Sequence, residues 1–172
     1  GTHGKTTTTS MIGEILTQAE LDPTIVVGGK VVNLDTNAKL GQGNYLVVEA
    51  DEFDRSFLKL TPTIAIITTL ESEHLDCYKD FNEIRNAFLE FANKVPFYGN
   101  VVLCVSEKGV NGLMADIHRP VITYGLLAEA DLQASDLKFQ ENQSSFKVAA
   151  RGKNLGQIKL SVPGAHNVKN SL

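Results

Sequence analysis

The sequence predicts an α/β fold in which a doubly wound, mostly parallel sheet is followed by a small antiparallel β-meander near the C-terminal end. Five apolar, β-rich runs are expected to form strands, at residues 24–29, 45–51, 63–70, 100–105 and 120–125. Their hydrophobicity is continuous rather than alternating, which is typical of parallel strands that are covered on both faces. Helical patterns lie between some of these runs, and strands that alternate with helices indicate βαβ units.

Three helices are expected among these strands. Residues 6–19 carry an apolar stripe at helical spacing, and so do residues 81–95, which end before Pro96 and the turn letters "YGN". A third, shorter helix is expected at residues 108–117. These helices would cover the faces of the parallel sheet.

The pattern changes after Gly125. The segments "DLQASDLKFQ", "SSFKVAAR" and "LGQIKLSVPG" alternate polar and apolar residues, which predicts antiparallel strands with one solvated face. The last letters, "HNVKNSL", have the character of a helix start. Because the chain begins inside a glycine-rich loop and ends in this helix, we expect the 172 residues to be one domain of a larger protein.

Composition and charge exclude several classes of function. The net charge of −4 argues against broad binding to nucleic acid or to an anionic membrane, since both require a basic surface. No apolar run approaches the roughly 20 residues of a membrane span. The two cysteines, Cys77 and Cys104, have no C-x-x-C spacing and are expected to be reduced thiols in a cytoplasmic protein.

The first ten residues, "GTHGKTTTTS", resemble a phosphate-binding loop of the P-loop type. Glycines let backbone amides turn inward around a phosphate, and a helix that begins there directs its positive end at the same anion. Lys5 would then reach the terminal phosphates, and the hydroxyl of Thr6 would hold Mg²⁺. The alternative is a glycine-rich terminus with a solvated lysine, but the amphipathic helix directly behind the loop favours the phosphate site.

Carboxylates follow the second predicted strand. Glu49 comes first after the apolar residues, and Asp51, Glu52 and Asp54 follow it. Ligands of open α/β sheets bind beyond the carboxyl ends of the strands, where a carboxylate can complete a magnesium shell. The position of Glu49 favours it over the three later residues as the metal ligand. A solvated acidic turn is the alternative.

The third predicted strand also ends in polar residues, namely Glu71, Glu73, His74 and Asp76. A single histidine is more often a hydrogen-bonded structural residue than a ligand. In the predicted topology, however, three strand ends meet at one edge of the sheet, and together they favour contact with a metal or a phosphate.

Several longer segments resemble the central ATP-binding domain of the Mur ligases, in the same order and over essentially all 172 residues. These segments are "GTHGKTTTTSM", "EADEFDRSFLKL", "ITTLESEHLDCY", "PFYGNVVLC", "VITYG" and "PGAHNVKNS". His3 resembles the alanine-adding branch of the family and the related murein-peptide branch. The "EADEFDRSFLKL" segment is more similar to the alanine-adding branch.

The resemblance implies an amide-forming ligase that uses ATP and Mg²⁺. ATP would phosphorylate the carboxylate of UDP-N-acetylmuramate, and the amine of L-alanine would attack the resulting acyl phosphate, in cytoplasmic synthesis of a peptidoglycan precursor. In this family an N-terminal domain binds the UDP moiety and a C-terminal domain brings the amino acid. We therefore expect these 172 residues alone to be inactive.

The resemblance also assigns roles to individual residues. Lys5 would contact the β- and γ-phosphates, Thr6 and Glu49 would bind one Mg²⁺, and His74 would help to hold a second. The implied cofactor-binding residues are Gly1, Thr2, His3, Gly4, Lys5, Thr6 and Thr7 in the loop, and His166, Asn167 and Asn170 near the adenine. Without the resemblance, the last three would be interpreted as the start of a helix.

Two departures from the family pattern affect these roles. Ser72 and Glu73 replace the Pro and Asp of the motif E-P-D-H-L-D, so the turn that carries His74 is expected to be less rigid. Phe88 stands where several branches carry a carbamylated lysine, which fits the alanine-adding branch. The alternatives are a murein-peptide recycling ligase and a regulatory ATP-binding module without ligase activity.

Overall fold

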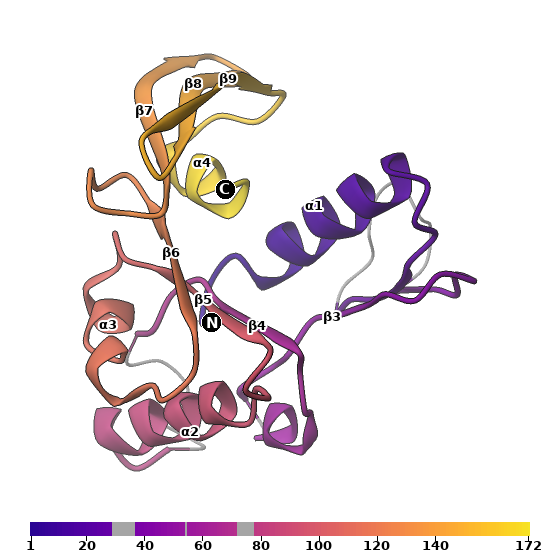
Figure 1. Ribbon diagram of the computed structural model, residues 1–172, viewed down its shortest axis with the longest axis vertical. Helices are drawn as coiled ribbons and strands as arrows, with labels where there is room; N and C mark the ends of the chain where they lie inside the picture. The colour runs from indigo at the N-terminus through magenta and orange to yellow at the C-terminus, as the bar shows by residue number, and fades with distance from the viewer. Residues whose placement is uncertain (29–36, 54, 72–77) are drawn as a thin grey trace.

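Hydrogen bonding divides the strands into two sheets in the computed structural model, which describes residues 1–28, 37–53, 55–71 and 78–172 (Figure 1). The smaller sheet has the order β2-β1-β3, with β1 at Thr24–Val26, β2 at Ala38–Lys39 and β3 at Leu46–Val48. The larger sheet runs in order from β4 to β9, with β4 at Ile64–Ile67, β5 at Asn100–Cys104, β6 at Val121–Gly125, β7 at Leu132–Gln140, β8 at Gln143–Ala150 and β9 at Lys153–Leu160.

Strand direction confirms the predicted fold class. In the smaller sheet, β1 is parallel to β3 and antiparallel to the short β2. In the larger sheet, the neighbouring strands from β4 to β7 are parallel to one another. The predicted meander is present as the antiparallel strands β7, β8 and β9. One detail differs from the expected single sheet, because β3 and β4 do not pair among the described residues. The chain between them runs through an acidic loop and the 3₁₀ helix η1, Ser56–Lys59.

The first two predicted helices are confirmed, as α1 at Lys5–Gln18 and α2 at Phe81–Asn93. The third is shorter than expected, because α3 covers only Lys108–Asn111 before Gly112 and a separate 3₁₀ turn, η2, at Met114–Asp116. Glycine is a poor helix former, and residues 108–117 contain two. A final short helix, α4, spans Ala165–Asn170. No helix within the described ranges has the length and apolar character that crossing a membrane requires.

Helix α2 begins where its sequence supplies an N-cap. The backbone amide of Glu83 donates to the carboxylate of Asp80 at 2.9 Å, and the carboxylate of Glu83 accepts from the amide of Lys79 at 2.6 Å. Both bonds satisfy amides near the helix start that have no acceptor in a preceding turn. The helix therefore starts at a fixed residue and presents its apolar face to β4 and β5.

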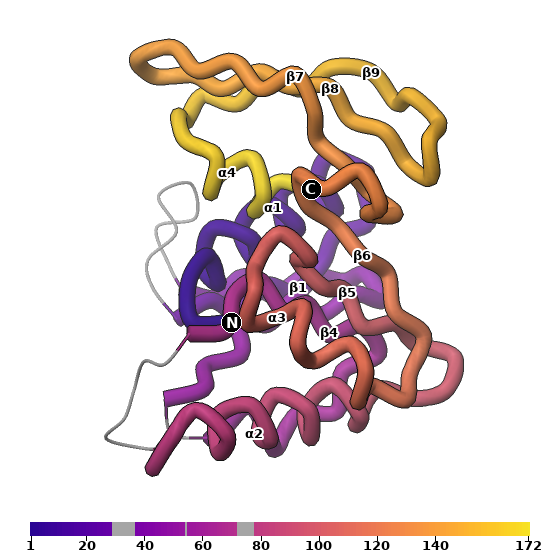
Figure 2. Tube along the Cα trace, turned by 90° about the vertical axis from the view of Figure 1, so that its left-hand side faces the viewer, coloured from indigo at the N-terminus to yellow at the C-terminus, as the bar shows by residue number. Residues whose placement is uncertain are grey.

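Two hydrophobic cores hold the elements together. The larger core lies between α2 and the strands β4 and β5 and includes Phe57, Ile84, Phe88, Phe91, Val101 and Leu103. The smaller core joins the meander to α4 through Ala134, Phe146, Val148 and Val168. Figures 1 and 2 show the result, with α4 beside the antiparallel strands and close to α1, and α2 at the opposite end of the molecule. Helix α4 is therefore packed against the meander and lies close to the start of the chain.

Phe88, which stands where several branches carry a carbamylated lysine, is a residue of the larger hydrophobic core. Its side chain is 2% exposed, and its ring lies 5.5 Å from the ring of Phe57. We expect Phe88→Ala to lower the free energy of unfolding by about 3–5 kcal/mol, because it leaves a cavity in a packed core. Urea unfolding would measure this, with Phe97→Ala as the control, because Phe97 is 85% exposed. An equal loss of unfolding free energy in the two variants would contradict the assignment of Phe88 to the core.

Candidate nucleotide site

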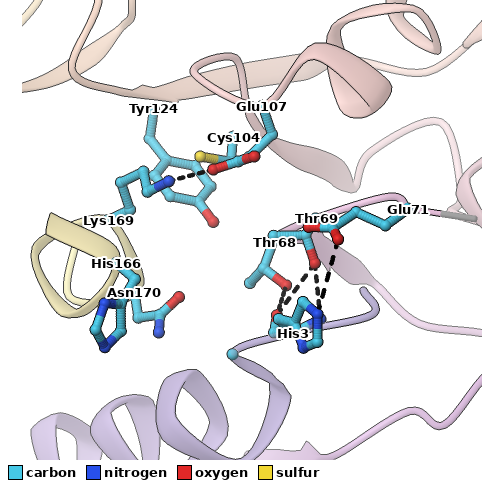
Figure 3. A pocket seen from close by; sticks show the side chains of 11 residues that line it. His3, Thr68, Thr69, Glu71, Cys104, Glu107, Tyr124, His166, Lys169 and Asn170 are labelled. Atoms are coloured by element: carbon cyan, nitrogen blue, oxygen red, sulfur yellow. Dashed lines mark hydrogen bonds and ion pairs between the residues drawn. The ribbon is translucent and has the colours of Figure 1, made fainter. Parts of the chain in front are cut away.

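The first residues of the chain are attached to the segment that follows β4. The Thr2 amide donates to the carbonyl of Thr69 at 3.3 Å, and their hydroxyls lie 2.9 Å apart. The His3 amide donates to the Thr69 hydroxyl at 2.7 Å, while the Thr68 hydroxyl donates to the His3 carbonyl at 2.6 Å (Figure 3). Gly1 is equally close, since a Cβ there would lie 2.3 Å from the hydroxyl of Thr68. The glycine-rich loop is therefore fixed at the carboxyl end of a parallel strand.

Gly4 turns this loop into α1. It adopts φ +80°, which favours glycine, and its carbonyl accepts the first helical bond from the Thr8 amide at 2.9 Å. The amides of Lys5, Thr6 and Thr7 therefore have no acceptor within the helix and point out of its N-terminal end. This end carries the positive pole of a 14-residue helix, with no acidic residue in the first turn. It is a suitable site for an anion such as a phosphate.

Lys5 lies in the first turn of α1 and pairs with a buried carboxylate. Its Nζ is 2.9 Å from Oε1 of Glu52 and 3.5 Å from Oδ1 of Asp51. Burial alone would lower the pKa of Lys5, but the hydrogen bond and charge of Glu52, assisted by Asp51, outweigh it, so the pKa lies above its ordinary value. Lys5 is therefore a fixed cation beside the helix N-terminus.

Thr6 faces Glu49, as a shared metal site requires. The Thr6 hydroxyl lies 2.9 Å and 3.0 Å from the two carboxylate oxygens of Glu49, and the Gly28 amide donates to Glu49 at 2.8 Å. Mg²⁺ binds oxygen ligands octahedrally at about 2.1 Å, so two neighbouring ligands are about 3.0 Å apart. The hydroxyl and carboxylate oxygens have both the chemistry and the spacing of two such neighbours. These residues fit a magnesium ion.

Further ligands would have to come from elsewhere. His74 lies outside the described residues, so its proposed contact with a second metal stays a prediction. In the part of the chain that the structure describes, no three His, Cys, Asp or Glu side chains gather into a metal site. Mg²⁺ commonly keeps several waters and takes phosphate oxygens besides one or two protein ligands. An ion between Thr6 and Glu49 would therefore depend on a bound phosphate.

A cavity of about 400 Å³ extends from the loop toward α4 (Figure 3). It is lined by His3, Gly4, Thr68, Thr69, Glu71, Cys104, Glu107, Tyr124, His166, Lys169 and Asn170. The structure thus places His166 and Asn170 in one cavity with the loop residues His3 and Gly4. Asn167 does not line this cavity, because its side-chain amide donates to the Pro163 carbonyl at 2.7 Å. Its contact with a nucleotide stays a prediction.

Sequence reasoning missed one wall of this cavity, formed by Cys104, Tyr124, Glu107 and Lys169. Cys104 is the last residue of the parallel strand β5 and Tyr124 the last but one of β6, so the rule that ligands bind beyond strand ends could have found them. Burial raises the pKa of both the Cys104 thiol and the Tyr124 hydroxyl, so both are neutral at physiological pH. An ion pair between Lys169 and Glu107 joins α4 to the start of α3. The wall therefore combines the buried, uncharged side chains of Cys104 and Tyr124 with a partly buried ion pair.

Gly4 and Gly152 provide a matched test of the loop. Both have nearly the same positive φ, +80° and +78°. A Cβ on Gly4 would lie 2.5 Å from Oδ1 of Asn170, whereas a Cβ on Gly152 would have no heavy atom within 4 Å. We expect Gly4→Ala to weaken Mg·ATP binding roughly tenfold or more, because the loop or Asn170 must move to relieve the overlap.

Calorimetric titration of both variants checks this expectation. Gly152→Ala carries the same backbone strain on the turn between β8 and β9, and we expect its affinity for Mg·ATP to equal that of the unmodified protein. Equal loss of affinity in the two variants would show that strain alone is responsible, and would contradict the role of the contact between the loop and α4.

A glycine-rich loop that leads from the edge of a parallel sheet into a helix, with Lys5 and Thr6 in the first turn, defines a P-loop nucleotide-binding domain of the α/β class. Residues 1–172 match the Mur ligase middle domain, and the chain belongs to the Mur ligase family, whose members are ATP-dependent ligases.

Individual relatives agree with this assignment. The chain is 47% identical to UDP-N-acetylmuramate–L-alanine ligase of Syntrophotalea carbinolica, over all of this chain and 38% of the relative. Two solved structures each share 28% identity over 99% of the chain. One is UDP-N-acetylmuramate:L-alanyl-γ-D-glutamyl-meso-diaminopimelate ligase from Neisseria meningitides, with a TM-score of 0.86 and 56% of that chain covered. The other is UDP-N-acetylmuramate–alanine ligase from Thermotoga maritima, with a TM-score of 0.82 and 37% covered. The chain spans only 38% of the length of the Syntrophotalea carbinolica relative.

Proposed function

We propose that this chain is the ATP-binding domain of a ligase that joins L-alanine to the carboxylate of UDP-N-acetylmuramate. The observation that carries the proposal is the placement of Thr6 opposite Glu49, at 2.9 Å, beside the Lys5 ammonium at the N-terminus of α1. A magnesium-bound triphosphate needs this combination of oxygen ligands, cation and amides. The curated relative at 47% identity supports the choice of substrates.

The protein's part in this reaction is to position and neutralise charge. Bound Mg·ATP supplies the phosphoryl group that converts the unreactive carboxylate into an acyl phosphate. The amides at the start of α1 bind phosphate oxygens, and Lys5 holds its positive charge where negative charge develops on the transferred group. Thr6 and Glu49 would hold the metal. These groups are fixed before the substrate arrives, so little reorganisation accompanies the transfer.

The cavity beside α4 is the proposed site of the nucleoside. Its buried wall of Cys104 and Tyr124 suits the apolar face of a base, while His166 and Asn170 offer hydrogen-bonding groups at its edge. It begins at Gly4, so it is continuous with the phosphate loop. UDP-N-acetylmuramate and L-alanine would be held largely by further domains of the complete, cytoplasmic enzyme.

Phosphate release by the full-length enzyme tests the proposal. We expect release from ATP only when UDP-N-acetylmuramate and L-alanine are both present. A murein-peptide recycling ligase is the second candidate, because the structure with the TM-score of 0.86 has a peptide-containing name. It would accept the peptide L-alanyl-γ-D-glutamyl-meso-diaminopimelate instead of L-alanine. Release with ATP alone would contradict both ligases and favour a regulatory ATP-binding module.

A further inference from the structure

Glu52 is a charged residue in the protein interior whose role the reaction described above does not explain. It follows β3 in the acidic segment, and its side chain is 1% exposed, whereas that of the neighbouring Asp51 is 59% exposed. Both carboxylates contact Lys5, but Glu52 does so at 2.9 Å and Asp51 at 3.5 Å. Glu52 is therefore the nearer and far less solvated partner of the loop lysine.

The difference in burial decides which partner Lys5 keeps when a phosphate arrives. An ammonium group has three donors, so Lys5 can bind phosphate oxygens while it still donates to one carboxylate. A buried carboxylate that loses its cation remains desolvated and uncompensated, which is strongly unfavourable. Asp51 is exposed, and water can replace Lys5 as its partner at little cost. An incoming phosphate therefore displaces Asp51 and leaves the contact with Glu52.

Glu52 is itself held from a different part of the chain. The hydroxyl of Tyr78, which is 1% exposed, donates to the backbone carbonyl of Glu52 at 2.7 Å, and the Arg55 amide donates to the same carbonyl at 3.3 Å. The guanidinium of Arg55 lies 4.8 Å from the centroid of the Tyr78 ring and 2.6 Å from the carboxylate of Glu83. The segment before α2 thus fixes the backbone from which the carboxylate reaches Lys5.

We propose that Glu52 is a positioning residue that holds the Lys5 ammonium at the phosphate site before and during phosphoryl transfer. This inference rests on the proposed ligase function for its kinetic consequence only. A misplacement of about 1 Å in a catalytic group can slow a reaction roughly 100-fold. The fixed position of Lys5 therefore matters more to the rate of transfer than to the binding of ATP.

The first test measures the pKa of Lys5 in the full-length protein without ATP. The protein is labelled with lysine that carries ¹³C at Cε, the signal of Lys5 is assigned from its absence in Lys5→Arg, and its pKa is measured by NMR. In Glu52→Gln, burial remains while the opposing charge is lost, so we expect a lower pKa than in the unmodified sequence. Glu129→Gln, an exposed position, is the matched control. An unchanged pKa in Glu52→Gln would overturn the proposal.

The second test separates binding from turnover. For Glu52→Gln we expect kcat to fall roughly 100-fold, because the Lys5 ammonium is no longer held in place. The dissociation constant of Mg·ATP should rise less than about threefold, because the variant also removes a negative charge that repels the triphosphate. Unchanged kcat, or affinity lost in proportion to kcat, would overturn the proposal. Glu52→Asp keeps the negative charge but shortens the side chain by one methylene group. In this variant the pKa of Lys5 should lie closer to that of the unmodified protein than it does in Glu52→Gln, while kcat should still fall.

Glu52→Asp also guards against a misfolded glutamine variant, and wild-type kcat in this aspartate variant would overturn the positioning role. The two tests separate this inference from the ligase proposal. If the unmodified enzyme does not release phosphate with UDP-N-acetylmuramate and L-alanine, the ligase function fails, while the NMR titration and the Mg·ATP affinities still test Glu52.

Discussion

Lys5→Ala in the full-length enzyme is expected to lower kcat/KM by about a thousandfold or more, because it removes the only cation in the first turn of α1. The ammonium lies at the helix N-terminus, where it would stabilise the charge that develops on the transferred phosphoryl group. Backbone amides at the same site remain, so weak Mg·ATP binding should persist. Initial-rate measurements with all three substrates check the prediction.

Stability must be measured in the same experiment, because Lys5 is the partner of the buried Glu52. Removal of one member of such a pair leaves an uncompensated charge, so we expect a lower midpoint of thermal unfolding but an intact fold. Circular dichroism at the assay temperature shows whether the variant remains folded. Lys153→Ala, at an exposed position in β9, is the control and should have normal turnover. Near-normal turnover of a folded Lys5→Ala enzyme would show that the phosphate loop is misassigned.

Much of the site could be predicted because the chemistry lies at ends of elements. The loop before α1 and the first carboxylate after β3 are both visible in the sequence, and the structure brings Thr6 and Glu49 within hydrogen-bonding distance. The parallel topology makes this convergence a general consequence of the fold. Long periodic segments such as α2 and the alternating strands of the meander were predictable for the same kind of reason, since each carries its own pattern.

The role of Glu52 could not be read from the sequence, because neighbouring carboxylates look alike there. Glu52 is buried and Asp51 is exposed, although they are adjacent. The backbone of Glu52 is held by Tyr78, whose hydroxyl reaches the Glu52 carbonyl from 26 residues away. Burial of this kind is decided by tertiary packing, and no local pattern encodes it. The cavity wall of Cys104 and Tyr124 was missed for a different reason, because both residues have the apolar character of ordinary core positions although each lies at the end of a parallel strand.

The division into two sheets was also beyond sequence reasoning. Periodicity identifies strands but does not say which of them are neighbours, and the apolar runs that end at β3 and begin at β4 have the same character. The structure pairs β3 with β1, and β4 with β5. The loop is hydrogen-bonded to Thr68 and Thr69 after β4 of the second sheet, while Glu49, the proposed magnesium ligand, follows β3 of the first. The proposed phosphate site therefore lies at the start of α1, between the residues that follow β3 of one sheet and those that follow β4 of the other.

Glu49→Gln is expected to raise the Mg²⁺ concentration needed for half-maximal activity by about tenfold or more and to lower kcat/KM about 100-fold. Glutamine has the same size as glutamate and keeps a side-chain oxygen. This oxygen can still accept the hydrogen bond that the backbone amide of Gly28 donates to Glu49 at 2.8 Å in the unmodified protein, so the fold should persist. It removes the negative charge that attracts the ion. A magnesium titration of initial rates at saturating ATP measures the effect.

Binding without metal distinguishes a metal ligand from a general binding residue. In EDTA, we expect ATP to bind Glu49→Gln at least as tightly as the unmodified enzyme, because a negative charge near the phosphates has been removed. In Mg²⁺, the order should reverse, since the uncharged amide oxygen is a weaker ligand than the carboxylate oxygen that lies 2.9 Å from the Thr6 hydroxyl. Glu129→Gln, at an exposed position, should alter neither titration. An unchanged magnesium requirement in Glu49→Gln would remove Glu49 from the metal site and leave its contacts with Thr6 and Gly28 as a purely structural clamp on the loop.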